Sequence, residues 1–304
     1  MGLKLKIIIN PSSGRETARL NIEDMLAYLV PLGMMERADI FYTSGKGDAC
    51  AFAANTDASQ YDYIIAVGGD GTVNEVVTGM LRGGIKLPLA IYTSGTVNDF
   101  ATINKLPTGP SDFARMLMKP CMQKVDCGKA GDNYFLNVLA AGLLTDVAYK
   151  VPSDLKTAFG PAAYWISAAK DLSSITKTMP VSFKTADEEY DEDIVFFLIS
   201  NTKSVGGFRK LMKNADLNDG KLDVLILKKL DIGDIMPLLG NLLVGEHINN
   251  DRVIYFQTDK LEIFARNDDR IIADIDGEEG PALPILVECI PDAITLIVPR
   301  EEDL

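Results

Sequence analysis

Apolar and polar positions alternate in two kinds of block along the first 120 or so residues. Short runs rich in isoleucine, leucine and valine are each followed by a longer stretch of mixed character. Strands covered on both faces read as nearly continuous apolar sequence, so the short runs predict a buried parallel sheet. They are Lys4 to Asn10, Ala38 to Tyr42, Tyr63 to Val67 and Leu87 to Tyr92. The stretches between them predict helices, the first from about Arg15 to Leu32, and together they predict an α/β domain.

The pattern changes near residue 122. Short β-rich runs follow, mostly separated by turn residues, which indicates an antiparallel β-sandwich. These runs are Lys124 to Lys129, Tyr134 to Leu139, Pro180 to Thr185, Ile194 to Ser200, Leu222 to Leu227, Val253 to Thr258, Lys260 to Phe264, Arg270 to Asp274, Ile285 to Glu288 and, last, Ala293 to Val298. Helical stretches are predicted near Pro161 to Leu172 and Ile232 to Leu243. The acidic run Asp187 to Asp193 is interpreted as a solvated hairpin loop.

Length and composition fit a two-domain globular protein. The chain has 304 residues, which exceeds the usual size of one core, with 47% apolar and 24% charged residues. Its longest apolar stretches are shorter than the roughly 20 residues that cross a bilayer, and Met1 to Lys6 lacks the apolar core expected of a signal peptide. Four cysteines without a C-x-x-C pair predict reduced thiols in the cytoplasm. A net charge of −13 argues against nucleic acid as a partner and against general attraction to anionic membranes.

The most informative motif is Gly68-Gly-Asp-Gly-Thr-x-Asn-Glu75, directly after the third predicted strand. Glycines remove side chains where a backbone turns sharply and where a bulky anion comes close. The following helix would point its free N–H groups and dipole at that anion. Asp70 would repel phosphate, so its expected task is to hold Mg²⁺ beside the phosphates. The motif matches neither the Walker loop nor the G-x-G-x-x-G fingerprint.

All four predicted strands end in small, hydroxylated loops that contain glycine. They are Asn10-Pro11-Ser12-Ser13-Gly14, Thr43-Ser44-Gly45, the motif above, and Thr93-Ser94-Gly95-Thr96-Val97-Asn98-Asp99. In an open α/β sheet such loops meet at the carboxyl ends of the strands, where ligands bind. The sequence therefore predicts a nucleotide phosphate site at that edge.

Three of these segments resemble the signatures of the diacylglycerol kinase catalytic domain: Asn10-Pro-x-Ser-Gly14, Gly68-Gly-Asp-Gly-Thr-x-Asn-Glu75 and Gly95-Thr-x-Asn-Asp-Phe-Ala101. The whole chain resembles the soluble bacterial lipid kinases, relatives of sphingosine and ceramide kinases. The resemblance implies a three-layer nucleotide-binding domain of residues 1–122 plus about 292–304, and a β-sandwich lipid domain of residues 123–291. It also implies an ATP and catalytic site in the cleft between them.

The resemblance implies a set of site residues. The nucleotide set is Asn10, Pro11, Ser12, Ser13, Gly14, Thr43, Gly68, Gly69, Asp70, Gly71, Thr72, Val73, Asn74, Thr96, Asn98 and Asp99, with Asp70 organising Mg²⁺. A structural Mg²⁺ is expected on Asp216, Asp219 and the carbonyl of Lys221; from the residues alone this segment reads as a β-turn. The general base is expected to be Glu278 or, second, Asp276, which the sequence does not separate. His247, the only histidine, is interpreted as structural.

The expected activity is ATP-dependent phosphorylation of a membrane lipid hydroxyl, diacylglycerol first, by a cytoplasmic enzyme that contacts the inner face of the membrane transiently. Two alternatives stay open. An NAD kinase shares Gly-Gly-Asp-Gly-Thr and would phosphorylate a soluble nucleotide. A non-catalytic lipid- or nucleotide-sensing protein could use the same scaffold. The sequence also leaves open which lipid is the acceptor and whether the chain forms a homodimer.

Overall fold

The computed structural model describes residues 2–13, 17–94, 98–142, 178–205, 211–231, 233–234, 237–238, 241, 245–300 and 302. They belong to two compact units, Met1–Val125 with Asp292–Leu304, and Asp126–Pro291. The predicted helix Pro161 to Leu172 lies outside the described residues, and Ile232 to Leu243 is described only in part. The chain therefore contains an α/β unit and a strand-rich unit.

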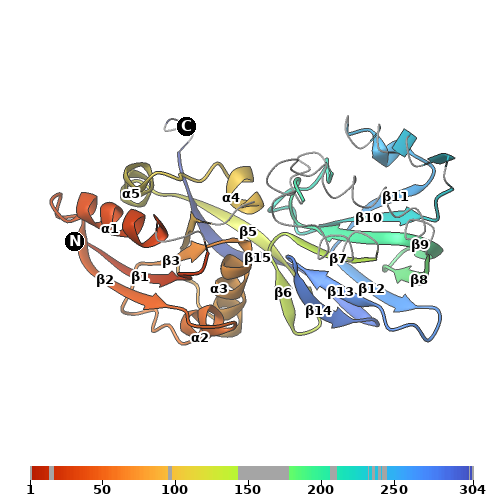
Figure 1. The fold of residues 1–304 in the computed structure, drawn as a ribbon, viewed down its shortest axis with the longest axis horizontal. Coiled ribbons are helices and arrows are strands. Elements are labelled where there is room, and N and C mark those ends of the chain that lie inside the picture. Colours follow the sequence, from red (N-terminus) through yellow and green to blue (C-terminus); the bar gives the residue numbers. More distant parts are fainter. Residues whose placement is uncertain are drawn as a thin grey trace. The chain divides into compact units, whose positions relative to one another are not determined.

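The first unit is built on a parallel sheet (Figure 1). Its strands are β1 (Leu3–Ile9), β2 (Met35–Tyr42), β3 (Tyr63–Gly68) and β4 (Leu89–Thr93), in the order β2-β1-β3-β4, and the end of β15 (Ile285–Val298) pairs in parallel with β4. The carboxyl ends of β1 to β4 therefore face the same edge, as the sequence predicts. β2 ends the row, and none of its residues is buried.

Helices cover both faces of this sheet (Figure 1). α1 (Thr17–Leu29) packs beside α5 (Pro110–Met118) on one face, and α2 (Asp48–Ala54) packs beside α3 (Asp70–Arg82) on the other. α4 (Asp99–Ile103) is a short helix before α5. α3 is amphipathic because Val73, Val76, Val77 and Met80 recur at helical spacing, and all four are buried. The three-layer arrangement puts the start of α3 at the end of β3.

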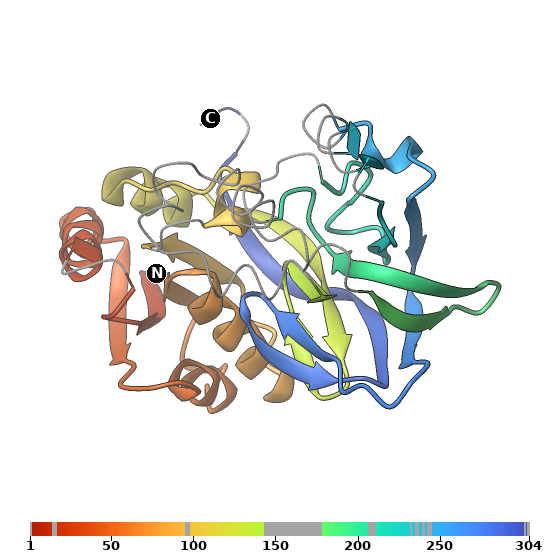
Figure 2. The ribbon, with the colours of Figure 1, turned by 45° about the vertical axis from the view of Figure 1, so that its right-hand side comes forward.

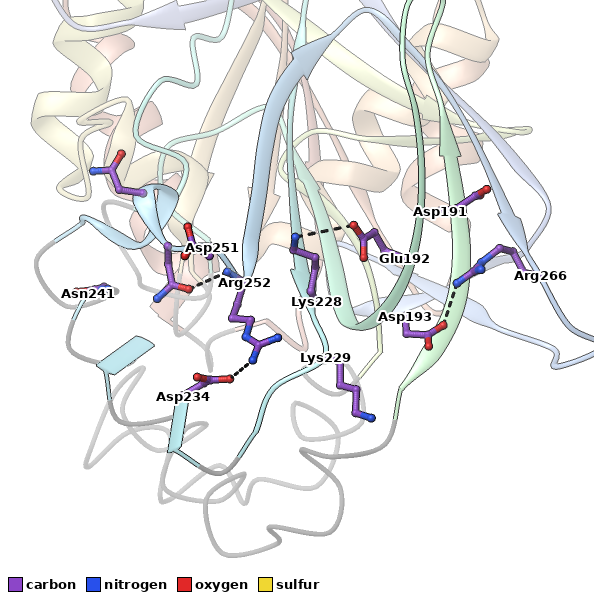
Figure 3. Close-up of a pocket in the computed structure, with 12 residues that line it drawn as sticks. Asp191, Glu192, Asp193, Lys228, Lys229, Asp234, Asn241, Asp251, Arg252 and Arg266 are labelled. Atoms are coloured by element: carbon purple, nitrogen blue, oxygen red, sulfur yellow. Dashed lines mark hydrogen bonds and ion pairs between the residues drawn. The ribbon is translucent and has the colours of Figure 1, made fainter.

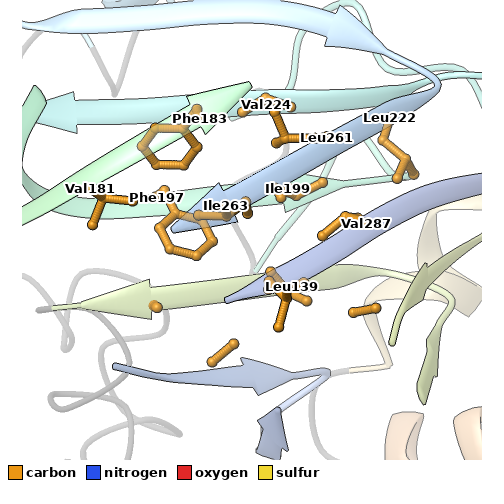
Figure 4. Packing of buried hydrophobic residues seen from close by; sticks show 14 of the residues in the cluster. Leu139, Val181, Phe183, Phe197, Ile199, Leu222, Val224, Leu261, Ile263 and Val287 are labelled. Atoms are coloured by element: carbon orange, nitrogen blue, oxygen red, sulfur yellow. The ribbon is translucent and has the colours of Figure 1, made fainter. Parts of the chain in front are cut away.

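The second unit is an antiparallel β-sandwich. It contains the second half of β5 (Cys121–Ala130) and the first part of β15. Its other strands are β6 (Asn133–Phe135), β7 (Val138–Gly142), β8 (Met179–Lys184), β9 (Glu189–Ser200), β10 (Leu222–Lys228), β11 (Val253–Thr258), β12 (Lys260–Ala265), β13 (Ile272–Ile275) and β14 (Glu278–Ala282). β9 pairs with β8 through its first half and with β7 and β10 through its second half. A core of apolar side chains fills the space between the layers, with Phe183 and Phe197 in edge-to-face contact at 5.4 Å (Figure 4).

The structure corrects three details of the predicted strands. Tyr134 to Leu139 is two strands, β6 and β7, with a break at residues 136–137. The two predicted runs from Ile285 onward are one continuous strand, β15. Most of the acidic run belongs to β9 rather than to a loop, because partners offset its charges: Asp191 accepts a hydrogen bond from Ser182, and Asp193 pairs with Arg266 at 2.8 Å.

Candidate functional site

The loops that end β1, β2, β3 and β4 are joined to one another by hydrogen bonds. The Asn10 backbone N–H donates to the Val67 carbonyl at 2.9 Å, and the Thr43 N–H donates to the Ile9 carbonyl at 2.9 Å. The Ser94 N–H donates to the Gly68 carbonyl at 3.1 Å. These contacts bring the small hydroxylated segments to one place at the carboxyl edge of the sheet, where α/β proteins bind ligands.

Side chains of the same loops extend this network. The Asn10 amide nitrogen donates to Thr72 Oγ1 at 3.0 Å, and Asn10 Oδ1 accepts the Ser12 N–H at 2.9 Å. The hydroxyls of Ser13 and Ser94 lie 3.2 Å apart. Asn10 therefore shapes its own turn and fastens it to the first turn of α3. Ser94, which was not in the predicted set, joins the first and fourth loops.

The glycines at the end of β3 have ordinary backbone angles, and one of them has a packing role. None of Gly68, Gly69 and Gly71 has a positive φ, and Gly69 is extended at φ −87° and ψ −177°, which any residue adopts. The backbone angles of these three glycines therefore do not require glycine, and the expectation that their missing side chains let an anion come close stays a prediction. Gly68 is required for packing instead, because a Cβ there would lie 2.5 Å from Thr72 Cβ. The missing side chain lets Thr72 sit over the strand end and accept the Asn10 bond.

The N-terminus of α3 lies at this place. Gly69 is its N-cap without a side-chain hydrogen bond, so the first N–H groups and the helix dipole face outward. Asp70 opens the helix, half-buried. Asn74 Oδ1 is buried and has no hydrogen-bond partner among the described residues. Val73, in the predicted nucleotide set, points its side chain into the core, and its N–H donates to the Gly69 carbonyl, so its observed contacts are those of packing.

The loop after β2 is shaped by an aspartate that sequence reasoning missed. Asp48 Oδ2 accepts hydrogen bonds from the Ser44 hydroxyl, the Ser44 N–H and the Gly45 N–H, at 2.7, 2.7 and 3.0 Å. These bonds, the Ser44 hydroxyl first, hold the pKa of this carboxyl below its ordinary value. Glu75 Oε1 in turn accepts the Gly47 N–H at 2.9 Å, tying the loop to α3. A serine four residues before an acid at a helix start is the signal that could have revealed this turn.

The fourth loop is described in part. Asn98 adopts a left-handed conformation, φ 51° and ψ 46°, and its carbonyl accepts the Thr102 N–H at 3.0 Å, which starts α4. Of the other predicted residues, Gly14 and Thr96 and the side chain of Asp99 lie outside the described residues. Pro11 and Ser12 are exposed.

In the second unit, both carboxylate oxygens of Asp276 accept hydrogen bonds from backbone N–H groups. Its Oδ1 accepts the Val138 N–H at 2.8 Å and the Asn137 N–H at 3.2 Å, and its Oδ2 accepts the Leu136 N–H at 3.1 Å. This clamp explains the break between β6 and β7, because the N–H groups at the break bond to a carboxylate instead of to a neighbouring strand. Asp276 itself is left-handed at φ 50°, next to Gly277 at φ 89°. The hydrogen bonds of Asp276 are therefore those of a residue that stabilises the fold.

Glu278 is placed differently, two residues later. It begins β14, pairs across the tight turn with Ile275, and is exposed. Asp274 Oδ1 accepts the Gly277 N–H at 2.8 Å and so fixes the turn from its other side. The turn therefore holds the Glu278 backbone through two carboxylates while its own side chain reaches solvent.

The acidic turn of residues 216–221 forms as a hydrogen-bonded turn. Asp216 Oδ1 accepts the Asn218 N–H at 3.1 Å, and Asp219 Oδ1 accepts the Lys221 N–H at 3.0 Å. The buried Asp126 accepts the Gly220 N–H at 2.7 Å. Burial above all raises the pKa of the neighbouring Asp223, and the charges of Asp219 and Asp216 add to this. Among the described residues, no group of three or more His, Cys, Asp or Glu side chains is arranged to hold a metal ion.

A cavity of about 950 Å³ lies elsewhere in the second unit (Figure 3). None of the predicted site residues lines it. Its wall carries charges of both signs, many of them already paired: Arg252 with Asp234 at 3.0 Å and Lys228 with Glu192 at 3.8 Å. A polyphosphate would have to displace these acids, so this cavity does not suit the nucleotide.

His247 is fully buried, as a structural residue would be. Its Nε2 lies 2.8 Å from the Leu211 carbonyl, and burial lowers the pKa of the ring. No helix among the described residues is long and apolar enough to cross a membrane.

Comparison with known proteins gives one consistent result. Residues 4–130 match the diacylglycerol kinase catalytic domain, and residues 137–298 match the YegS C-terminal NAD kinase beta sandwich-like domain. The chain is 34% identical to a diacylglycerol kinase of Staphylococcus saprophyticus over 93% of its own length and 92% of the relative's. It is 32% identical to a diacylglycerol kinase of Bacillus subtilis over 98% and 97%. A crystal structure of a diacylglycerol kinase from Bacillus anthracis superposes with a TM-score of 0.79, at 26% identity and 97% coverage of both chains.

Proposed function

The chain belongs to the diacylglycerol kinase family and is therefore a lipid kinase, and we propose that it transfers the γ-phosphoryl group of ATP to the free hydroxyl of diacylglycerol, giving phosphatidic acid. The structural observation that carries the proposal is the joining of four glycine- and hydroxyl-bearing loops at the start of α3. The family assignment favours this reading over an NAD-kinase-like activity or a sensor without catalysis.

The residues of the first unit suit a nucleotide triphosphate. Serine and threonine hydroxyls and the first N–H groups of a 13-residue helix are donors, the chemistry that phosphate oxygens need. Asn10 and Ser13 would hold the first loop against the phosphates, and Thr43 would flank them from the loop that Asp48 shapes. Asn74 Oδ1, buried without a partner among the described residues, would accept a hydrogen bond from a nucleotide hydroxyl, amine or bound water.

A divalent metal fits beside these donors. Asp70 would hold Mg²⁺, because a carboxylate at the start of a phosphate-binding helix can approach phosphates only through a cation. When bound, Mg²⁺ neutralises charge that develops on the phosphate oxygens. Asp70 is thus proposed as a catalytic residue, and Asn98 and Asp99 as the further polar groups of the fourth loop.

The second unit supplies the base in this proposal. The Glu278 carboxylate takes the proton of the lipid hydroxyl while that oxygen bonds to the γ-phosphorus, and the bond to the ADP oxygen breaks. Asp276 is proposed as a positioning residue, not as the base. Its two oxygens already accept three backbone N–H groups, and their task is to hold the turn that presents Glu278.

The acidic turn is proposed to hold a structural Mg²⁺ through Asp216, Asp219 and the Lys221 carbonyl. Each aspartate uses one oxygen within its turn, so the site would rest on the other oxygens, the carbonyl and water. Buried Asp126 and Asp223 add negative charge nearby, which a divalent cation would offset. The proposed location is the cytoplasm, with transient contact to the inner face of the membrane.

The test is a phosphorylation assay with the full chain. A panel of diacylglycerol, phosphatidylglycerol, a sphingoid base, a prenyl alcohol and NAD is offered with labelled ATP and Mg²⁺. We expect label in the diacylglycerol product, a large loss in Asp70→Asn and Glu278→Gln, and parent turnover in Glu279→Gln, which removes the same charge one residue away. Label in NAD alone would refute the proposed substrate. Parent turnover in Asp70→Asn or in Glu278→Gln would refute the role given to that residue.

A further inference from the structure

The hydroxyls of Ser13 and Ser94 meet although their loops follow strands that are not neighbours. Among the described residues, β1 and β4 each pair with β3, on opposite sides of it, and not with each other. Neighbouring strands lie about 4.8 Å apart, so β1 and β4 are separated by roughly twice that distance. The two hydroxyl oxygens are nevertheless only 3.2 Å apart. The first and fourth loops therefore bend toward each other at the end of β3.

Both loops are fastened to the last two residues of β3. The Asn10 N–H donates to the Val67 carbonyl, and the Ser94 N–H donates to the Gly68 carbonyl. α3 begins two residues after β3 ends, on the opposite face of the sheet from α1 and α5 (Figure 1 and Figure 2). The Asn10 side chain reaches Thr72 in the first turn of this helix. The two hydroxyls therefore lie beside the helix N-terminus to which the proposed function assigns the phosphates.

Only one of the two hydroxyl protons is held firmly. A serine hydroxyl has one proton to donate. That of Ser13 is directed at the Asn10 carbonyl, at 2.8 Å, so in the longer contact Ser94 is the donor and Ser13 the acceptor. O–H···O bonds are usually about 2.7–2.8 Å long, so a separation of 3.2 Å is that of a weak bond. The Ser94 hydroxyl makes no other hydrogen bond among the residues that the structure describes.

A phosphate oxygen is a better acceptor for this proton than the Ser13 hydroxyl. Hydrogen bonds to an ionised acceptor are shorter and roughly twice as strong as those between neutral groups. Rotation about χ1 redirects the Ser94 hydroxyl without moving its backbone, which the bond to Gly68 fixes. A bound triphosphate can therefore replace the contact with Ser13 at little cost.

We propose that Ser94 is a phosphate-binding residue, whose hydroxyl is held by Ser13 when no nucleotide is bound and donates to a phosphate oxygen when the triphosphate binds. The metal proposed at Asp70 bridges the β- and γ-phosphates, so the acceptor is an oxygen of one of these two. Ser94 precedes the Gly95-Thr-x-Asn-Asp signature and belongs to none of the three signature segments. This role of Ser94 rests on the nucleotide site of the proposed function.

A hydroxyl that only fastened the two loops would behave differently. Its loss would lower the melting temperature and weaken the binding of every nucleotide alike, whereas the loss of a phosphate ligand affects only nucleotides that carry the contacted phosphate. Ser94→Ala removes the hydroxyl. Ser59→Ala is the matched control, because the Ser59 hydroxyl donates to Asp57 Oδ1 at 2.7 Å in the loop before β3, at the opposite edge of the same sheet.

The experiment is calorimetric titration of the full chain, without lipid, with a non-hydrolysable ATP analogue and with AMP, each in Mg²⁺, together with melting curves for every variant. We expect Ser94→Ala to bind the analogue about tenfold more weakly than the parent, the factor that one hydrogen bond to a charged acceptor supplies. Its affinity for AMP, which lacks the β- and γ-phosphates, and its melting temperature should stay near the parent's. Ser59→Ala should match the parent with both nucleotides.

A second pair of variants decides the question if Ser94→Ala does not fold. Ser94→Asn and Ser94→Asp carry side chains of nearly the same size and shape that differ in charge. A carboxylate that faces the phosphates repels them, so Ser94→Asp should bind the triphosphate analogue at least about tenfold more weakly than Ser94→Asn. The difference between the two variants should be much smaller for AMP.

Three results would overturn the role of Ser94: parent affinity for the analogue in Ser94→Ala, an equal loss for the analogue and AMP with a lowered melting temperature, or equal binding of the analogue by Ser94→Asn and Ser94→Asp. Failure of the proposed function looks different. A parent chain that binds neither nucleotide would refute the nucleotide site itself. A parent that binds the analogue but does not phosphorylate diacylglycerol would refute only the proposed acceptor.

Discussion

Replacing Asp276 separates a structural clamp from a catalytic base. In Asp276→Ala, the N–H groups of Leu136, Asn137 and Val138 lose their acceptor, bonded at 3.1, 3.2 and 2.8 Å. Hydrogen bonds to a charged group contribute ~1.5–3 kcal/mol each. Because water can enter this partly buried segment and replace the lost acceptor, we take about 1 kcal/mol per bond, which is below that range. The left-handed backbone adds about 1 kcal/mol, because alanine tolerates φ 50° less well than aspartate.

We therefore expect Asp276→Ala to lower the free energy of unfolding by about 4 kcal/mol. For a domain of this size, that lowers the melting temperature of the second unit by roughly 8–16 °C. In Asp276→Asn the amide oxygen can still accept two of the three N–H groups, while the amide NH₂ faces the Leu136 N–H. This variant should therefore lower the free energy of unfolding by only about 1–2 kcal/mol. The measurements are calorimetric melting and hydrogen exchange at residues 136–138, whose amides should exchange faster in both variants.

Kinetics on the same variants complete the test. Glu278→Gln should lower kcat by about 10²–10⁴, the usual contribution of a general base, with the melting temperature unchanged. Asp276→Asn should lower kcat less than tenfold at a temperature where it is folded. Two results would refute the reasoning: an Asp276→Ala protein that melts with the parent, or an Asp276→Asn protein that is as inactive as Glu278→Gln but fully stable.

Three further predictions test other parts of the structure. Gly68→Ala should destabilise the first unit by about 1–3 kcal/mol through overpacking, because the new Cβ would meet Thr72 Cβ at 2.5 Å; an unchanged melting temperature would contradict this packing. In the folded chain a thiol reagent should modify exposed Cys121, while buried Cys127, whose pKa burial raises, should react only on unfolding; mass spectrometry of labelled peptides reads both. Asp219→Ala should remove the Mg²⁺-dependent part of the stability, which is about 2.7 kcal/mol at a hundredfold excess of Mg²⁺ over its dissociation constant. The measurement is the melting temperature with and without Mg²⁺, and an equal Mg²⁺-dependent shift in parent and variant would refute the structural ion.

The local pattern of the sequence was sufficient for the parallel half of the fold. β1, β3 and β4 are each covered on both faces, so each can be recognised in the sequence as a run of consecutive apolar residues. The sequence also placed the loops together, because parallel strands bring their carboxyl ends to one edge whatever the side chains are. Asn10, Thr43 and Gly68 were found in this way, and hydrogen bonds now join their segments.

Relations between distant residues were decided by the tertiary structure alone. Asp276 lies 138 to 140 residues from the amides it holds, so nothing near it in the sequence distinguished a clamp from a base. Gly68 is needed because Thr72 packs over it, not because its backbone is unusual. The acidic residues of β9 looked like a loop because the cations and hydroxyls that offset them come from other strands. A periodic pattern reports which side of an element is covered, whereas these roles depend on which atoms cover it, and only the folded chain determines that.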